Sequence, residues 1–240
     1  MGDICDVKFQ ELDYLPIDIR YFDKRARNIA SIVNEDPKLL KVLSEFLLLF
    51  TNKINFKSRF KKWKEELQLI KRPHNKDNMD KLISELYDSY NVVKDYHIDK
   101  FRGLIFEYVM ENHYKHMYNR FSKGCKVIIN GTEIKYLCVE DENKNRNTID
   151  IAGYSRTKSE FYELKVGPDG FKDNVIKYLN ILNKVACENR ISEKTIVGCM
   201  TLETKNKLKI KLRMIEEDSS KLELLGRNEL MNILKHSPLI

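Results

Sequence analysis

The chain has 240 residues, of which 42% are hydrophobic and 33% are charged, and its net charge is +7 at neutral pH. This balance is typical of a globular protein with one sizeable core, or one core and a small accessory domain. No run of about 18 apolar residues is present, which excludes a membrane-spanning helix. The positive charge is compatible with binding to polyanions but does not identify one.

The cysteines and the N-terminal segment indicate a cytoplasmic protein. Five cysteines are scattered without a C-x-x-C pair, and their odd number favours a reduced compartment over a disulfide framework or a structural zinc site: Cys5, Cys125, Cys138, Cys187 and Cys199. The segment "MGDICDVKFQELD" is acidic and polar, unlike a signal peptide.

The first hundred residues carry helical patterns. In the second of these patterns, Phe56, Phe60, Trp63 and Leu67 recur at the spacing of one helix face. The expected helices are Pro37–Ile54, Phe56–Ile70, Met79–Val93 and Asp99–Phe121. We therefore expect an N-terminal helical region over residues 1–98.

Residues 99–240 mix strand and helix patterns and predict an α/β core. An Asn130-Gly131 turn between two alternating segments is a strong hairpin signal. The expected strands are Cys125–Gly131, Thr132–Glu140, the two segments "TIDIAG" and "FYELKV", Thr195–Glu203 and Lys207–Glu217, and the expected helices are Phe171–Cys187 and Gly226–His236.

The stretch from Asn147 to Gly167 places charged residues among the apolar residues of two strands. Side chains alternate faces along a strand, so Asp150 points away from the face of Ile149 and Ile151. Glu163 and Lys165 share one face of the next strand. Because the turn between the strands is short, we expect antiparallel pairing, which brings Asp150 close to Glu163.

Two adjacent carboxylates repel each other unless a cation lies between them. Oxygen ligands of this kind suit Mg²⁺ or Mn²⁺, with coordination sites left for water and phosphate. Lys165 can reach the same place, where it orients or deprotonates an attacking water or neutralises charge on a phosphate. A simpler interpretation is an exposed hairpin with a Glu163–Lys165 surface pair.

The residues "TID" (Thr148–Asp150) and "ELK" (Glu163–Lys165), with twelve intervening residues, resemble the motif of the PD-(D/E)xK nuclease superfamily. That superfamily includes many restriction endonucleases and Holliday junction resolvases. The resemblance covers about residues 99–205, where a helix, three strands, a helix and a further strand follow one another. Ile149 replaces the proline of the motif, a position that the family often relaxes.

The resemblance implies a restriction endonuclease-like core, with a mixed central β-sheet flanked by helices. It implies that Asp150, Glu163 and the carbonyl of Leu164 bind the Mg²⁺ or Mn²⁺ ion and that Lys165 is catalytic. A glutamate on the preceding helix often reaches the metal through water in this family. We expect Glu107 in that role, with Glu111 as the competing candidate one turn further along.

The function expected from this resemblance is that of a metal-dependent nuclease, an endonuclease that acts on DNA ahead of RNA, in defence or restriction. Enzymes of this fold often cleave duplexes with two copies of one active site, so a homodimer is also expected; no membrane partner is expected. One alternative is a catalytically idle member of the fold that binds nucleic acid or a protein. Another is an unrelated helical interaction protein with an accidental motif.

Two weaker signals accompany the motif. The segment "KSRFKKWK" (Lys57–Lys64) either grips phosphates or forms the solvated basic face of an amphipathic helix. His113 and His116 have a spacing found in metal sites, but no suitably spaced cysteine accompanies them.

Overall fold

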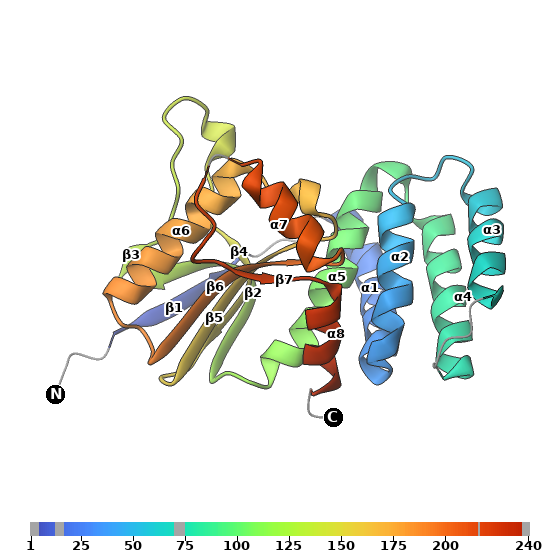
Figure 1. Cartoon of the computed structure of the whole chain (residues 1–240), viewed down its shortest axis with the longest axis horizontal. Helices are drawn as coiled ribbons and strands as arrows, with labels where there is room; N and C mark the ends of the chain where they lie inside the picture. Colours follow the sequence, from blue (N-terminus) through green and yellow to red (C-terminus); the bar gives the residue numbers. More distant parts are fainter. Residues whose placement is uncertain (1–4, 13–16, 70–74, 216, 237–240) are drawn as a thin grey trace.

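The computed structural model describes residues 5–12, 17–69, 75–215 and 217–236. Within this part, the chain forms a mixed β-sheet with helices on both faces, and further helices extend from one side of it (Figure 1). The α/β class, the mixed sheet and the N-terminal helical region expected from the sequence are confirmed.

Five α-helices precede most of the sheet in the chain. They are α1 (Ile17–Glu35), α2 (Leu40–Leu49), α3 (Phe56–Leu69), α4 (Lys76–Val92) and α5 (Ile98–Lys115), with a 3-10 turn at Pro37–Leu39 before α2. The last helix was expected to reach Phe121 but ends at Lys115, because the residues from Arg120 onward pair with neighbouring strands instead.

The sheet combines antiparallel and parallel pairing. Its strands are β1 (Val7–Glu11), β2 (Arg120–Ile129), β3 (Thr132–Glu133), β4 (Ile149–Tyr154), β5 (Lys158–Lys165), β6 (Lys194–Thr201) and β7 (Glu223–Leu225), in the order β1-β2-β4-β5-β6-β7 with β3 beside β2. Pairing is antiparallel from β1 to β5 and parallel from β5 to β7.

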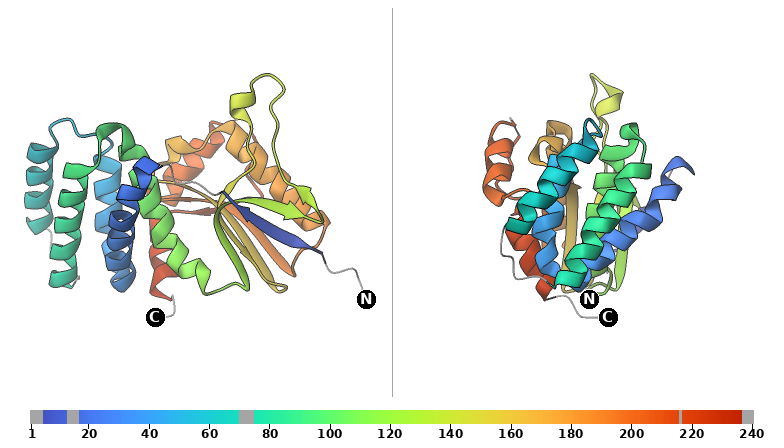
Figure 2. Two further views of the ribbon diagram at one scale, coloured as in Figure 1. Left: turned by 180° about the vertical axis from the view of Figure 1, so that it is seen from behind. Right: turned by 90° about the vertical axis from the view of Figure 1, so that its right-hand side faces the viewer.

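Each face of the sheet packs against its own set of helices (Figure 2). On one face, Ile151, Tyr162 and Met200 join a large apolar cluster with residues of α1–α5 and α8 (Arg227–Lys235). On the other face, Phe161 and Val197 pack with α6 (Asp173–Glu188) and α7 (Lys205–Arg213). The N-terminal helices therefore share one hydrophobic core with the sheet.

The edge strand β1 lies within the region that we expected to be helical. Val7 pairs with Ile129 and Glu11 with Cys125, so this strand belongs to the sheet although it precedes every helix. The expected helical region, residues 1–98, therefore contains one strand of the sheet before its helices begin at Ile17. The division into two domains at residue 98 stays a prediction.

The strand expected at Lys207–Glu217 is wrong, because the residues up to Arg213 belong to helix α7, which Met214 caps; residue 216 lies outside the described residues. Thr204 caps the helix by accepting a hydrogen bond from the backbone of Lys207, at 3.3 Å. Leu208 and Leu212, four residues apart, are the buried side chains. The alternation of lysines and apolar residues is typical of a strand, but the spacing of four residues between the two leucines places them on one face of a helix.

The hairpin around Asn130-Gly131 is present, with φ angles of 49° and 79° in the turn. Its second strand is much shorter than the expected Thr132–Glu140, since β3 ends at Glu133. Beyond it, the Ile134 N–H still donates to the Val127 carbonyl of β2 at 2.9 Å, and Tyr136 then forms a bridge with Arg146. Between β3 and β4 the chain leaves the sheet and forms a protruding arm beside α6 (Figure 1).

The apolar face expected on the second helix is confirmed. Phe56, Phe60, Trp63 and Leu67 are buried, and α3 packs on α2 and α4 at the end of the molecule farthest from the sheet (Figure 1). The basic side chains of the same helix, Lys57, Lys61 and Lys64, are exposed. None of the described helices is long and apolar enough to cross a membrane.

Candidate active site

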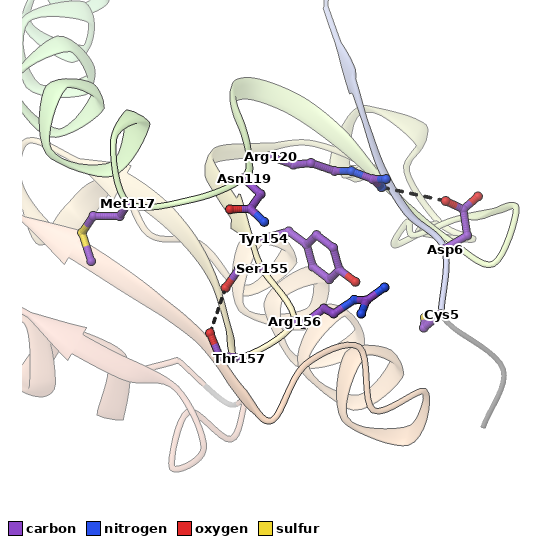
Figure 3. A pocket seen from close by; sticks show the side chains of 9 residues that line it. All are labelled: Cys5, Asp6, Met117, Asn119, Arg120, Tyr154, Ser155, Arg156 and Thr157. Atoms are coloured by element: carbon purple, nitrogen blue, oxygen red, sulfur yellow. Dashed lines mark hydrogen bonds and ion pairs between the residues drawn. The ribbon is translucent and has the colours of Figure 1, made fainter. Parts of the chain in front are cut away.

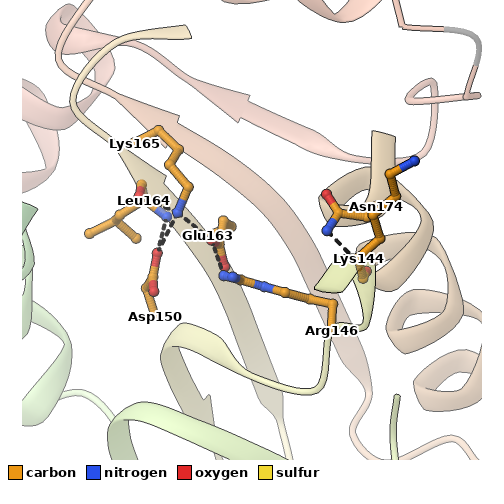
Figure 4. Close-up of polar contacts among 7 residues, drawn as sticks. All are labelled: Lys144, Arg146, Asp150, Glu163, Leu164, Lys165 and Asn174. Atoms are coloured by element: carbon orange, nitrogen blue, oxygen red, sulfur yellow. Dashed lines mark hydrogen bonds and ion pairs between the residues drawn. The ribbon is translucent and has the colours of Figure 1, made fainter. Parts of the chain in front are cut away.

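The motif residues lie where strands β4 and β5 diverge. The last paired residues of the two strands are Ile151 and Tyr162. Beyond this pair, the Leu164 N–H donates to the Asp150 carboxylate at 2.8 Å. In a regular strand pair it would donate to a backbone carbonyl of the neighbouring strand. The expected antiparallel hairpin is confirmed, and the divergence brings Asp150, Glu163 and the Leu164 peptide together (Figure 4).

The alternation expected along β4 fails at Asp150. Ile149 and Ile151 were expected on one face, but they belong to the cores on opposite sides of the sheet. The pairing partner of this segment, β2, contains Gly124 with a φ angle of 57°, a conformation that distorts a regular strand. The strand is therefore irregular at the position where the acidic pair, Asp150 and Glu163, comes together.

The ammonium group of Lys165 lies among three oxygens of the site. It contacts Glu163 Oε1, donates to the Leu164 carbonyl oxygen at 3.1 Å and lies 3.5 Å from Asp150 Oδ2 (Figure 4). These are the oxygens that the family resemblance assigns to a metal ion. The lysine therefore supplies the positive charge that the two carboxylates require.

Glu163 has a second cationic partner, Arg146, which we did not single out in the sequence. The carboxylate is 0% exposed, and its Oε1 atom contacts both the Arg146 guanidinium and the Lys165 ammonium. Burial raises the pKa of Glu163, and the charge of Asp150 raises it further, whereas Lys165 and Arg146 lower it. The two cations thus counteract the cost of a fully buried charge.

Arg146 reaches the site from the protruding arm, and several contacts fix that arm. Its backbone pairs with Tyr136 at both N–H and C=O, and Asn174 of α6 donates to the Lys144 carbonyl at 3.0 Å (Figure 4). The sequence offered no signal beyond one cation in a polar loop. Only the folded position of the arm brings this side chain to Glu163.

Lys165 keeps its proton in this environment. Burial lowers its pKa, but the charges of Glu163 and Asp150 outweigh that effect, so the pKa is raised above the ordinary value of lysine. At neutral pH the side chain is therefore an ammonium group. In this arrangement it can stabilise negative charge or donate a proton.

Two observations test whether these residues fit a divalent ion. A cationic group already lies within reach of Asp150, Glu163 and the Leu164 carbonyl, an oxygen set of the kind that Mg²⁺ and Mn²⁺ prefer. The second oxygen of Glu163 is buried and has no hydrogen-bond partner among the described residues. The residues fit such an ion as two carboxylates and a carbonyl. Within the described ranges, no three His, Cys, Asp or Glu side chains form a metal-binding group.

Asp150 lines a cleft of about 960 Å³ to which both halves of the chain contribute, whereas the Glu163 side chain beside it is fully buried. Asp150 and Lys165 line it from the sheet. Arg27 of α1, Leu48 of α2 and Thr51 line it from the helical region. The N-terminal helices therefore form part of the wall of the candidate active site, in addition to packing on the sheet.

Glu107 lines this cleft together with Asp150, whereas Glu111 lines a separate hollow beside α1. Both side chains flank Lys123, whose ammonium is 4.0 Å from Glu107 and 3.3 Å from Glu111. The geometry places Glu107 on the side of the acidic pair, which favours it over Glu111. Its role through a water molecule stays a prediction.

Burial and the charge of Asp150 raise the pKa of Glu107 to about 7. A carboxylate with a raised folded-state pKa destabilises the fold progressively as pH rises from about 4.5 to 7. We expect Glu107→Gln, which stays neutral, to unfold at a higher temperature than the wild type at pH 8, by the equivalent of roughly 1–3 kcal/mol. At pH 4 the two should melt alike.

Thermal melts at both pH values, in EDTA, test this expectation. Glu111→Gln is the matched control and should give no gain, because it removes the closer ion pair with Lys123. A Glu107→Gln protein that is no more stable than wild type at pH 8 would contradict the expectation.

The weaker sequence signals do not join the cleft. His113 is buried beside Tyr114, and His116 is exposed, so the pair does not form a metal site with the acidic residues. The segment Lys57–Lys64 lies on the outermost helix of the stack (Figure 1). Its role in substrate binding stays a prediction.

Comparison with known proteins gives no family for this chain. No family model matches it, and no curated protein matches it. Among solved structures, the crystal structure of protein VC1899 from Vibrio cholerae is similar over 97% of this chain, with 14% sequence identity and a TM-score of 0.46. The chain spans 57% of the length of that protein.

Proposed function

We propose that this protein is a metal-dependent nuclease that hydrolyses phosphodiester bonds, with DNA as the favoured substrate over RNA. The observation that carries the proposal is the Lys165 ammonium among oxygens of Asp150, Glu163 and Leu164, in a cleft between two halves of the chain. Family resemblance at the same residues supports it. We place the enzyme in the cytoplasm and expect an endonuclease of defence or restriction.

The residues of the chain have distinct parts in such a reaction. Asp150, Glu163 and the Leu164 carbonyl would hold Mg²⁺ or Mn²⁺, which supplies a Lewis acid and a bound water of lowered pKa. Arg146 balances the charge of Glu163 and keeps its carboxylate in place. Lys165 would, as an ammonium group, stabilise the negative charge that develops on the phosphate.

The direct test is incubation of the protein with plasmid, single-stranded DNA and structured RNA, each with Mg²⁺, Mn²⁺ or EDTA. We expect cleavage with either metal and none with EDTA, and we expect plasmid to be cut faster than RNA. Undiminished cleavage in EDTA would contradict the metal dependence. Preferential cleavage of RNA would contradict the choice of substrate.

A homodimer is part of the proposal because a single candidate active site in each chain would serve one strand of a duplex, so that two copies would cut both strands. Light scattering at micromolar concentration should give the mass of two chains, with the plasmid linearised in one encounter. A monomer that still makes double-strand breaks in one encounter would contradict it.

One observation favours a second candidate, a catalytically idle protein that binds nucleic acid or a protein partner. Lys165 and Arg146 already neutralise Glu163 without any metal ion. Calorimetric titration with Mg²⁺ and Mn²⁺, with Asp150→Asn as the comparison, separates the two. A nuclease should show binding that Asp150→Asn weakens, whereas the idle protein should show no difference between them.

A further inference from the structure

A second pocket lies at the opposite end of the β4–β5 hairpin from the acidic pair. Asp150 and Lys165 occupy the open end of the hairpin, and the turn Ser155–Thr157 closes the other. Around that turn is a pocket of about 670 Å³, within the size range of small-ligand sites, about 300–1,000 Å³. No residue that lines it also lines the catalytic cleft.

The side chains of this pocket carry an excess of positive charge. Arg120 and Arg156 reach into it on either side of the Tyr154 ring (Figure 3). Its carboxylate, Asp6, lies 3.9 Å from Arg120 and is shared with Lys8, at 2.8 Å. Within the described part of the chain, the Arg156 guanidinium has no hydrogen bond or ion pair. One guanidinium is therefore available to a ligand.

The turn that carries Arg156 is held in place on both sides. Ser155 and Lys158 close it with hydrogen bonds of 2.9 and 3.1 Å. The backbone of the neighbouring segment then fixes its outer side, since the N–H of Glu193 donates to the Arg156 carbonyl at 3.0 Å and that of Lys194 donates to Thr157 at 3.1 Å. A fixed backbone lowers the entropy lost when the side chain binds a ligand.

The remaining lining groups suit a phosphate ester. Ser155 and Thr157 place their hydroxyl oxygens 3.3 Å apart at the turn, and the Asn119 amide lines the same pocket. Tyr154 adds an aromatic ring, on which a base can stack. Guanidinium groups bind phosphate oxygens through paired N–H donors, with greater strength than neutral donors.

We infer that this pocket binds a phosphate group, carried either by a free nucleotide or by a nucleic acid strand, with Arg156 as the principal contact. The inference does not depend on nuclease activity, because the pocket and the cleft have no lining residue in common. Asn119 and Thr157 supply further hydrogen bonds to the phosphate, and Tyr154 supports the base, while the Ser155 hydroxyl stays bonded to the Lys158 backbone.

Calorimetric titration of the whole chain in EDTA, with AMP and with a short single-stranded DNA, tests this inference. Arg156→Ala should weaken binding of at least one probe by about tenfold or more, the loss expected for a charge-assisted contact. Arg156→Lys keeps the charge without the paired donors and should bind between the two. Arg213→Ala is the matched control, since Arg213 is also exposed and its loss changes the net charge equally.

The two probes distinguish the sources of the phosphate. AMP binding that Arg156→Ala weakens identifies a free nucleotide, whereas an effect on the DNA alone identifies a strand. The inference is overturned if the wild type binds neither probe or if Arg156→Ala binds both as the wild type does. It is also overturned if Arg213→Ala weakens binding as much, because the effect would then be one of net charge.

Discussion

Lys165→Ala should lower the rate of metal-dependent cleavage by about a hundredfold or more, the typical effect of removing a group that stabilises transition-state charge. Among the residues that the structure describes, the ammonium is the one group that contacts Glu163, Leu164 and Asp150 together. The variant should still fold, because Arg146 remains to balance the buried Glu163 carboxylate. Cleavage rates on plasmid, at saturating Mg²⁺, are the measurement.

The control is Lys194→Ala, which removes an exposed lysine at the start of β6 and should cleave at the wild-type rate. Circular dichroism and melting temperature establish whether each variant is folded. Full activity in a folded Lys165→Ala protein would rule out the role assigned to this lysine, and equal losses in both variants would point to net charge instead.

The second large effect is expected in stability, when both cationic partners of Glu163 are removed. Each single variant, Lys165→Ala or Arg146→Ala, leaves one cation on the buried carboxylate and should cost roughly 1 kcal/mol. The double variant leaves that charge unpaired, which typically costs about 3–5 kcal/mol. The two losses should therefore not be additive.

Denaturant unfolding of the four proteins in EDTA gives the coupling between the two cations. Adding Glu163→Gln to the double variant removes the unpaired charge and should restore part of the lost stability. If the losses of the two single variants add and Glu163→Gln restores nothing, the carboxylate does not depend on these two partners.

The sequence was informative about this site where its features are local to one strand. Asp150, Glu163 and Lys165 could be identified because each interrupts an alternating apolar pattern, and the short turn predicted that the strands pair. The divergence at Asp150 could not be predicted, since it depends on the partner strand β2 and on Gly124 within it. The side chain of Arg146 was missed because its position depends on contacts of the arm with α6.

The same distinction explains where the fold differs from the one expected from the sequence. In α7, lysines at alternate positions imitate a strand, and only burial of Leu208 and Leu212 against the sheet selects the helix. In β1, a single fully buried residue, Val7, marks a strand that pairs with residues far along the chain. Patterns within a few residues cannot reveal pairing over such separations.

That distant pairing has a consequence for how the chain folds. The helices α1–α5 form one insertion between two strands that lie side by side. At that edge the Asn130 N–H donates to the Asp6 carbonyl, and the Asp6 N–H donates to the Asn130 side chain, across 124 positions of the chain. During synthesis β1 is made before β2, and it stays unpaired until helices α1–α5 and β2 have been made. Such long-range closure is slow, and an unpaired strand invites pairing with other chains. In a fragment that starts at residue 99, the edge of β2 would always be unpaired, because the fragment lacks β1.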